Sequence, residues 1–220
     1  MLHPGQVLEE RDRWDADTRA ALATGAKAVV RLSARMPAAL RTRGLADHPV
    51  GGGAAAFEAA CRRLGLSLQH LGPGRGALGP WVLWTSGANP FLLKQAALLV
   101  EEGNRQGQLL DLDVYTRAGP VSRCLLGLPP RPCIVCGQPA AVCAGRSIHS
   151  SSSVESAFLV LLESSPTIIP DAVETQSHSR LQDYLKRSPD FSTGSPGGYA
   201  VGAEPPLHIR EIYTKGGDTP

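Results

Sequence analysis

The stretch GQLLDLDVYTRAGPVSRCLLGLPPRPCIVCGQPAAVCAGRSIH, residues 107–149, carries most of the chemistry in this chain of 220 residues. It combines an Asp-x-Asp pair in an apolar run, separated arginines, and a group of cysteines followed by a histidine. The alternation Leu-Asp-Leu-Asp-Val is typical of a strand with one buried face. We therefore expect the fold to be organised around this strand and the loop that follows it.

The acidic pair consists of Asp111 and Asp113. Side chains two residues apart on a strand lie on the same face, so the two carboxylates are predicted to project together. Adjacent carboxylates repel each other unless a cation or a base lies between them. Mg²⁺ suits such a pair, because it binds one or two protein carboxylates and completes its shell with water and phosphate oxygens. The alternative is an edge strand with a simply acidic outer face.

The cysteine group has the spacing Cys133-x2-Cys136-x6-Cys143-x5-His149. A Cys-x-x-Cys pair followed by Cys and His is the ligand set of a closed, four-coordinate structural Zn²⁺ site. The alternative is a compact folded loop with reduced thiols, an imidazole and no metal.

These motifs together resemble one family, the apo-citrate lyase phosphoribosyl-dephospho-CoA transferases, also called citrate lyase holo-acyl-carrier-protein synthases. The matching residues are Gly107, Leu109, Asp111, Asp113, Val114, Ser122, Arg123, Leu128, Pro129, Pro130, Arg131, Cys133, Cys136, Ala140, Ala141, Cys143, Ala144 and His149. Weaker similarity extends back to about Val7. The chain departs from the family before the acidic pair, where residues 104–108 lack the family's His and Arg.

The resemblance implies transfer of a phosphoribosyl-dephospho-CoA group from triphosphoribosyl-dephospho-CoA to a serine of the citrate lyase acyl carrier protein, with release of pyrophosphate. Such nucleotidyl transfer depends mainly on positioning and charge neutralisation. The resemblance also implies that Asp111 and Asp113 hold Mg²⁺ against the triphosphate, and that Arg123 and Arg131 bind the triphosphate oxygens. The alternatives are the same chemistry on another carrier protein, such as that of malonate decarboxylase, and a non-catalytic zinc-knuckle interaction module.

Further cations are candidate substrate contacts. Arg41 keeps a positive charge where the family has Pro-Gly-Pro-x-Lys at positions 37–41, although the glycine and second proline are replaced. Arg11 lies in an expected helix, where the alternative is a solvated helix face. Lys94 lies in another expected helix, where the alternative is an ordinary surface lysine.

Around the central strand we expect an α+β domain, residues 1–163, with a mixed sheet, packed helices and a compact Cys/His-rich loop. Helices are predicted over residues 4–23, 54–64, 90–102 and 154–163, and strands over residues 28–32, 81–84 and 109–116. Residues 47–53 are expected to form a flexible connection and residues 70–80 a loop. Residues 164–220 are rich in Ser, Pro, Gly and Thr, which predicts a loosely ordered tail.

Charge and composition disfavour several classes of function. The net charge of +2 is too small to indicate nucleic-acid binding, and 5% aromatic residues argue against base-stacking surfaces. No apolar run has the length of a membrane span, and the first residues lack the apolar segment of a signal peptide. Five cysteines, an odd number, fit reduced thiols or a metal better than a disulfide framework. We therefore expect a cytoplasmic protein.

Overall fold

The structure, a computed structural model, describes residues 3–164. Almost all of the predicted tail, residues 164–220, lies outside the described residues. The elements are α1 (Pro4–Ala23), β1 (Ala28–Ala34), α2 (Ala38–Thr42), α3 (Asp47–Arg63), β2 (Gln69–Gly76), β3 (Gly79–Ser86), α4 (Pro90–Gly103), η1 (Gln106–Leu109), β4 (Leu110–Thr116), β5 (Gly119–Pro120), η2 (Arg123–Leu126), α5 (Ala140–Gly145) and α6 (Ser151–Glu163).

The strands form one five-stranded sheet in the order β2-β3-β1-β4-β5. All four pairings are antiparallel. The α+β class is confirmed, but the expectation of a mixed sheet is wrong. Tight hairpins join β2 to β3 and β4 to β5, which fixes those pairs as antiparallel. The helices after β1 lead to β2, which runs in the same direction as β1, so β3 returns antiparallel to β1. Helix α4 then leads from β3 to β4, which also runs antiparallel to β1.

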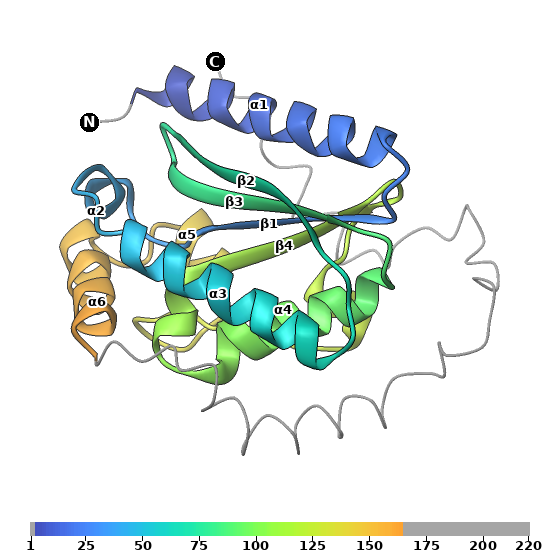
Figure 1. Ribbon diagram of the computed structural model, residues 1–220. Helices are drawn as coiled ribbons and strands as arrows, with labels where there is room; N and C mark the ends of the chain where they lie inside the picture. The colour runs from blue at the N-terminus through green and yellow to red at the C-terminus, as the bar shows by residue number, and fades with distance from the viewer. Residues whose placement is uncertain (1–2, 165–220) are drawn as a thin grey trace, which may run out of the picture. The chain divides into compact units, whose positions relative to one another are not determined.

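Helices lie on both faces of the sheet, with α1 on one side and α3 and α4 on the other (Figure 1). The main core lies on the α3 and α4 side and includes Leu32, Phe57, Trp84, Leu93 and Leu112, each fully buried. The smaller cluster under α1 contains Ala21, Leu22, Val29 and Leu83. Every residue of β1 is buried, because this central strand is covered on both faces.

Local signals account for the helices that were predicted correctly. Asn89 caps α4 by accepting a hydrogen bond from the Phe91 N–H at 2.9 Å, and Pro90 occupies the first helical position. Ser150 caps α6 by accepting from the Ser153 N–H at 3.1 Å, so this helix begins three residues before its predicted start. None of the helices within residues 3–164 is long and apolar enough to cross a membrane.

Two predicted irregular segments are regular instead. Residues 47–53 are not a flexible connection, because they form the first turns of α3. Gly53 lets this helix approach β4: a Cβ at Gly53 would lie 2.5 Å from a methyl carbon of Leu110. Most of residues 70–80 belong to β2, β3 and the turn between them rather than to a loop. As an edge strand, β2 tolerates the glycines and proline that hide it in the sequence.

Candidate functional site

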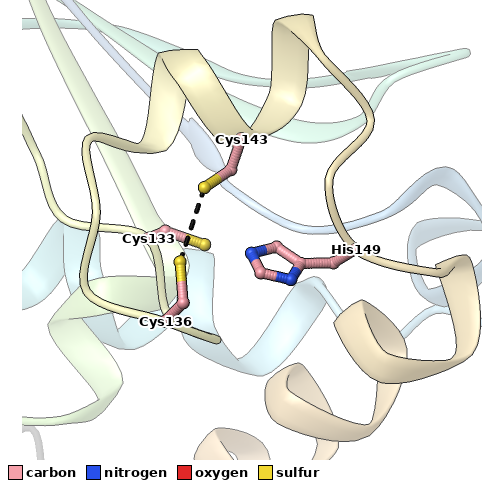
Figure 2. A group of neighbouring side chains, drawn as sticks. All are labelled: Cys133, Cys136, Cys143 and His149. Carbon is pink, nitrogen blue, oxygen red and sulfur yellow. Dashed lines mark hydrogen bonds between the residues drawn. The ribbon is translucent and has the colours of Figure 1, made fainter.

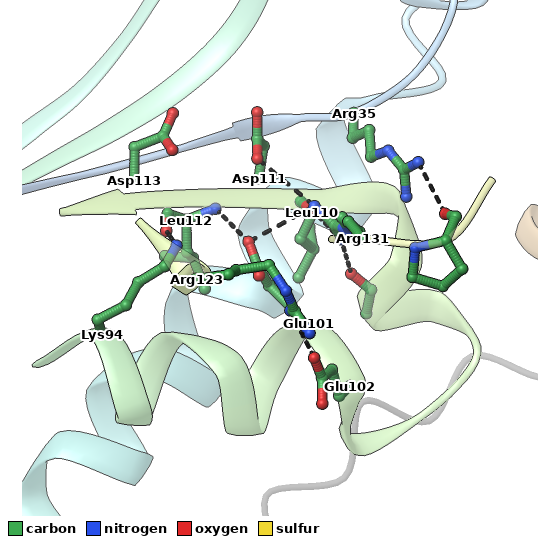
Figure 3. A network of polar contacts seen from close by, with 12 residues as sticks. Arg35, Lys94, Glu101, Glu102, Leu110, Asp111, Leu112, Asp113, Arg123 and Arg131 are labelled. Carbon is green, nitrogen blue, oxygen red and sulfur yellow. Dashed lines mark hydrogen bonds and ion pairs between the residues drawn. The ribbon is translucent and has the colours of Figure 1, made fainter. Parts of the chain in front are cut away.

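The acidic pair lies on β4, as predicted. Leu110, Leu112 and Val114 are buried, while the alternating Asp111 and Asp113 remain partly exposed. Figure 3 shows both carboxylates pointing away from α4. The carboxylates therefore face the same side of the sheet as α1.

The two carboxylates differ in environment. The side chain of Asp111 is 46% exposed. Asp113 is more enclosed, and the Tyr115 hydroxyl donates to its Oδ2 at 3.3 Å. Loss of hydration raises the pKa of Asp113 to about 6, and the adjacent Asp111 charge adds to this rise. The pair thus carries the electrostatic strain that a bound cation would relieve.

Helix α4 supplies side chains that complete the outer edge of β4. Lys94 Nζ donates to the Leu112 carbonyl at 2.7 Å, and Glu101 Oε1 accepts from the Leu112 N–H at 2.7 Å (Figure 3). Both side chains are buried. In the described part of the chain β5 pairs only with Tyr115 and Thr116, so these side chains take the place of a neighbouring strand beside Leu112.

Lys94 is therefore not a surface lysine, because its side chain is buried. Its ammonium group lies on the α4 side of β4, away from the exposed carboxylates (Figure 3). A lysine that satisfies a strand carbonyl leaves no periodic signal in the sequence, so its burial could not be predicted. The hydrogen bond of Lys94 joins α4 to the β4 backbone between the two aspartates.

Arg131 connects the acidic pair to this buried network. Its Nη2 donates to the carbonyls of Leu110 at 2.7 Å and Gly107 at 3.3 Å. Its Nη1 lies 3.4 Å from Asp111 Oδ1 and 3.6 Å from Glu101 Oε1. Burial raises the pKa of Glu101, whereas the charges of Arg131 and Lys94 lower it. Arg131 is thus fixed at the end of β4, between a buried and an exposed carboxylate.

Arg123 is not brought to the acidic pair. It forms an ion pair with Glu102 of α4, and its Nε donates to the Pro129 carbonyl at 2.9 Å (Figure 3). The chain turns back after β4 to pair as β5, but this hairpin does not place Arg123 against Asp111. A competing carboxylate on α4, distant in sequence, decides its position.

Arg41 lies on α2, a short helix that begins after Pro37. Its Nε donates to the Met36 carbonyl at 2.6 Å and its Nη1 to the Leu78 carbonyl at 3.2 Å. Burial lowers the pKa of Arg41, the Asp111 charge raises it, and the Arg11 charge lowers it. Arg11 is itself exposed on α1. The structure thus brings Arg41 and Arg11 within electrostatic range of each other, and Arg41 within range of Asp111.

Arg35 is a further cation at this end of the site, and sequence analysis did not select it. Its Nη2 donates to the Pro132 carbonyl at 3.2 Å. Burial and the Arg131 charge lower the pKa of Arg35, and the Asp111 charge raises it. Strand alternation alone could not find it, because the face that β1 shares with Asp111 follows from the register, in which Ser33 lies opposite Asp111.

The other end of the acidic face is closed by α1. Arg31 lies beside Asp113 in the register of β1 and β4. Its guanidinium carbon lies 4.8 Å from the Trp14 ring centre and 5.4 Å from that of Trp81, and its Nη2 donates to the Trp14 carbonyl at 2.8 Å. These contacts fix α1 over the Asp113 end, while Asp111 remains half exposed at the other.

The cysteine group is assembled as predicted. One potential ligand atom from each of Cys133, Cys136, Cys143 and His149 lies within 4.8 Å of all the others (Figure 2). The sulfur atoms of Cys136 and Cys143 are 3.5 Å apart, close to the edge of about 3.8 Å in a tetrahedral Zn²⁺–thiolate site. His149 Nε2 is buried without a hydrogen-bond partner in the described residues. This cluster could bind a metal ion.

Backbone N–H groups of the loop favour the thiolate form of Cys133. Burial acts to raise the pKa of Cys133, but the N–H groups of Val135 and Cys136 donate to its sulfur, and the net result is a pKa lowered to about 7. Gly137, with φ of 75°, forms the turn, and its N–H donates to the Cys133 carbonyl at 2.9 Å.

The cluster is joined directly to the acidic site. Arg131 and Pro132 immediately precede Cys133, and the Ala140 N–H donates to the Arg131 carbonyl at 2.8 Å. Pro132 also accepts the hydrogen bond from Arg35. The folded Cys/His loop therefore positions both Arg131 and the Pro132 carbonyl to which Arg35 donates.

Comparison with known proteins covers the whole of this site. The sequence model of the family described as apo-citrate lyase phosphoribosyl-dephospho-CoA transferase matches residues 4–164. A protein of that name from Escherichia coli O1:K1 / APEC is 28% identical over 158 residues, which span 71% of this chain and 86% of the relative. Another of that name, from Escherichia coli O139:H28 (strain E24377A / ETEC), is 33% identical over 122 residues, spanning 55% and 64%.

Proposed function

Since this chain belongs to the apo-citrate lyase phosphoribosyl-dephospho-CoA transferase family, we propose that it transfers phosphoribosyl-dephospho-CoA to the acyl carrier protein of citrate lyase. The donor in this proposal is the triphosphate precursor, the acceptor is a carrier serine, and pyrophosphate is released. The observation that carries the proposal is the acidic pair on β4, in which Asp111 is half exposed and bordered by arginines. The family match spans every residue of this arrangement.

The donor set of Asp111 and Asp113 suits Mg²⁺. Both groups offer hard oxygen ligands from one strand face, and lost hydration followed by the Asp111 charge raises the pKa of Asp113. Bound Mg²⁺ would supply positive charge to the phosphate oxygens. The exposure of Asp111 leaves room for the oxygens of a phosphate ester beside the pair.

The proposed reaction is a displacement at the α-phosphorus of the donor. A bond forms between the serine oxygen and phosphorus, and the bond from phosphorus to the bridging oxygen of the pyrophosphate breaks. The electron pair stays with the pyrophosphate, and the serine proton passes to water or to a carboxylate. Arg131 and Arg41 stabilise the charge that grows on the phosphates, and Arg11 adds longer-range attraction.

Other residues position this machinery. Lys94 and Glu101 fix the backbone of Leu112 between the two aspartates, so the spacing of the carboxylates follows from α4. Arg123 ties η2 to α4 through Glu102 and is assigned the same kind of structural role. Of the residues that the resemblance implies for catalysis, Asp111, Asp113 and Arg131 keep that role in this proposal, and Arg123 does not.

We also propose that Cys133, Cys136, Cys143 and His149 bind one structural Zn²⁺. The support is geometric: the ligand atoms converge, two sulfurs lie at nearly tetrahedral spacing, and a buried imidazole nitrogen has no partner in the described residues. The ion would stabilise the loop that presents Arg131 and Pro132 to the site.

The function is tested by incubating the full chain with triphosphoribosyl-dephospho-CoA, Mg²⁺ and apo-carrier protein, and then measuring the carrier by mass spectrometry. We expect the carrier to gain one phosphoribosyl-dephospho-CoA group and the solution to gain an equal amount of pyrophosphate. A parallel reaction with the malonate decarboxylase carrier measures specificity. An unmodified carrier in both reactions would contradict the enzymatic proposal and favour an interaction module.

A further inference from the structure

The face of β1 beside the acidic pair carries a row of polar residues. Ser33 lies opposite Asp111 in the register, and Arg35 follows two residues later on the same face. The backbone N–H of Arg35 donates to the Leu109 carbonyl at 2.7 Å, which extends the β1–β4 pairing past the ends of both strands. Figure 3 shows Arg35 on the same side of β4 as Asp111. The backbone therefore fixes Arg35 at the open end of the site.

Positive charge exceeds negative charge at this end. The acceptors of Arg35 and Arg41 are neutral backbone carbonyls, and among residues 3–164 neither has a carboxylate at ion-pair distance. Arg131 divides its charge between Asp111 and Glu101. A partly desolvated group of cations without equal countercharge is unfavourable, so the arrangement favours binding of a multiply charged anion.

We propose that Arg35, with Arg41 and Arg131, forms a pyrophosphate-binding site beside Asp111. The inference rests on the proposed function and deepens it: the site takes the two terminal phosphates of the donor and stabilises them as the leaving group. Arg35 is the residue that this assignment adds. Loss of hydration lowers the pKa of both Arg35 and Arg41, consistent with cations held in a poorly solvated site.

A purely structural role for Arg35 would require its hydrogen bond but not its positive charge. Its guanidinium makes one hydrogen bond within the described residues, to the Pro132 carbonyl, and a neutral amide side chain can make the same bond. Arg35→Gln therefore separates the two roles, because it keeps a donor for Pro132 and removes the charge. A structural Arg35 predicts unchanged anion binding in this variant, whereas a phosphate-binding Arg35 predicts a loss.

The test is calorimetric titration of inorganic pyrophosphate into the full chain with Mg²⁺ present, without donor or carrier protein. Wild type is expected to bind pyrophosphate more tightly than inorganic phosphate, and to lose at least about tenfold in affinity on Arg35→Gln. Arg62→Gln, which removes an exposed charge from α3, is the matched control and should bind like wild type. If Arg35→Gln does not fold, Arg41→Gln replaces it and is expected to show a comparable loss.

Pyrophosphate binding that is absent in wild type, or equal in wild type and folded Arg35→Gln, would overturn the proposal. Inhibition kinetics then test whether pyrophosphate binds at the site of the donor's two terminal phosphates. Pyrophosphate is expected to compete with the triphosphate donor, and competition should weaken in Arg35→Gln; inhibition that does not depend on donor concentration would contradict a shared site. Arg35-dependent pyrophosphate binding without carrier modification would instead contradict the proposed function, so the two failures are distinguishable.

Discussion

Replacement of Asp113 by Asn should make the protein more stable at neutral pH. The pKa of Asp113 is raised from 3.8 to about 6 in the folded chain, first by burial and then by Asp111. The neutral acid is therefore compatible with folding, and its ionisation is opposed. The stability that this group contributes is present below about pH 4 and is lost as the pH rises through about 6.

The magnitude follows from the shift. Each pKa unit corresponds to about 1.4 kcal/mol, and sharing of the effect with Asp111 reduces the total to about 1–3 kcal/mol. Asn is neutral at every pH, so Asp113→Asn should match wild type near pH 4 and exceed it by this amount near pH 7 without divalent cations. Urea unfolding followed by circular dichroism, in chelator-treated buffer at both pH values, measures the difference.

Magnesium gives the same experiment a second readout. Millimolar Mg²⁺ should stabilise wild type at pH 7 and narrow its difference from Asp113→Asn, because a ligand that binds only the folded state adds to its stability. Glu9→Gln removes an exposed carboxylate from α1 and serves as the control. A destabilised Asp113→Asn at pH 7, or an identical response of wild type and variant to Mg²⁺, would refute this account of the pair.

Three other changes test the surrounding structure. Glu101→Leu should lower the free energy of unfolding by about 1–3 kcal/mol in urea titrations, because it leaves the buried Leu112 N–H without its acceptor; an unchanged free energy of unfolding would contradict the network. Gly53→Ala should cost about 1–3 kcal/mol in thermal unfolding, since its Cβ meets Leu110, whereas Gly51→Ala meets nothing within 4 Å and should stabilise α3. Metal analysis of untagged protein should find about one zinc per chain, and Cys133→Ser should lose it; a metal-free, fully folded wild type would end the zinc proposal.

Features encoded by local sequence were predictable. The alternation around Asp111 gave both the strand and the shared face of the carboxylates. The helix predicted over residues 90–102 is observed as α4, with Asn89 as its cap and Pro90 at its first position. The spacing of the cysteines gave a loop whose ligand atoms converge in the structure. Each of these depends on residues within a few turns or one strand of each other, where propensity and periodicity act directly.

Features that depend on distant partners were not predictable from one sequence. Gly53 looked like part of a flexible connection, but its missing side chain serves close packing of α3 on β4. Lys94 satisfies a carbonyl of β4. Arg123 pairs with Glu102 rather than with the acidic pair. Arg35 is recognised as a neighbour of the acidic pair only once the register of β1 and β4 is known. In each case a tertiary contact, rather than local preference, decides where the side chain lies.

The most direct test of the central claim is the rate at which Asp111→Asn modifies the citrate lyase acyl carrier protein. The substitution keeps the size of the half-exposed side chain and removes one negative charge from the pair. Mass spectrometry of the carrier, sampled over time with donor and Mg²⁺ in excess, gives the rate for wild type and variant. We predict a fall of at least about a hundredfold, the scale expected when one strong electrostatic contact to a transition state is lost. Equal rates of carrier modification would contradict the assignment of the acidic pair to catalysis.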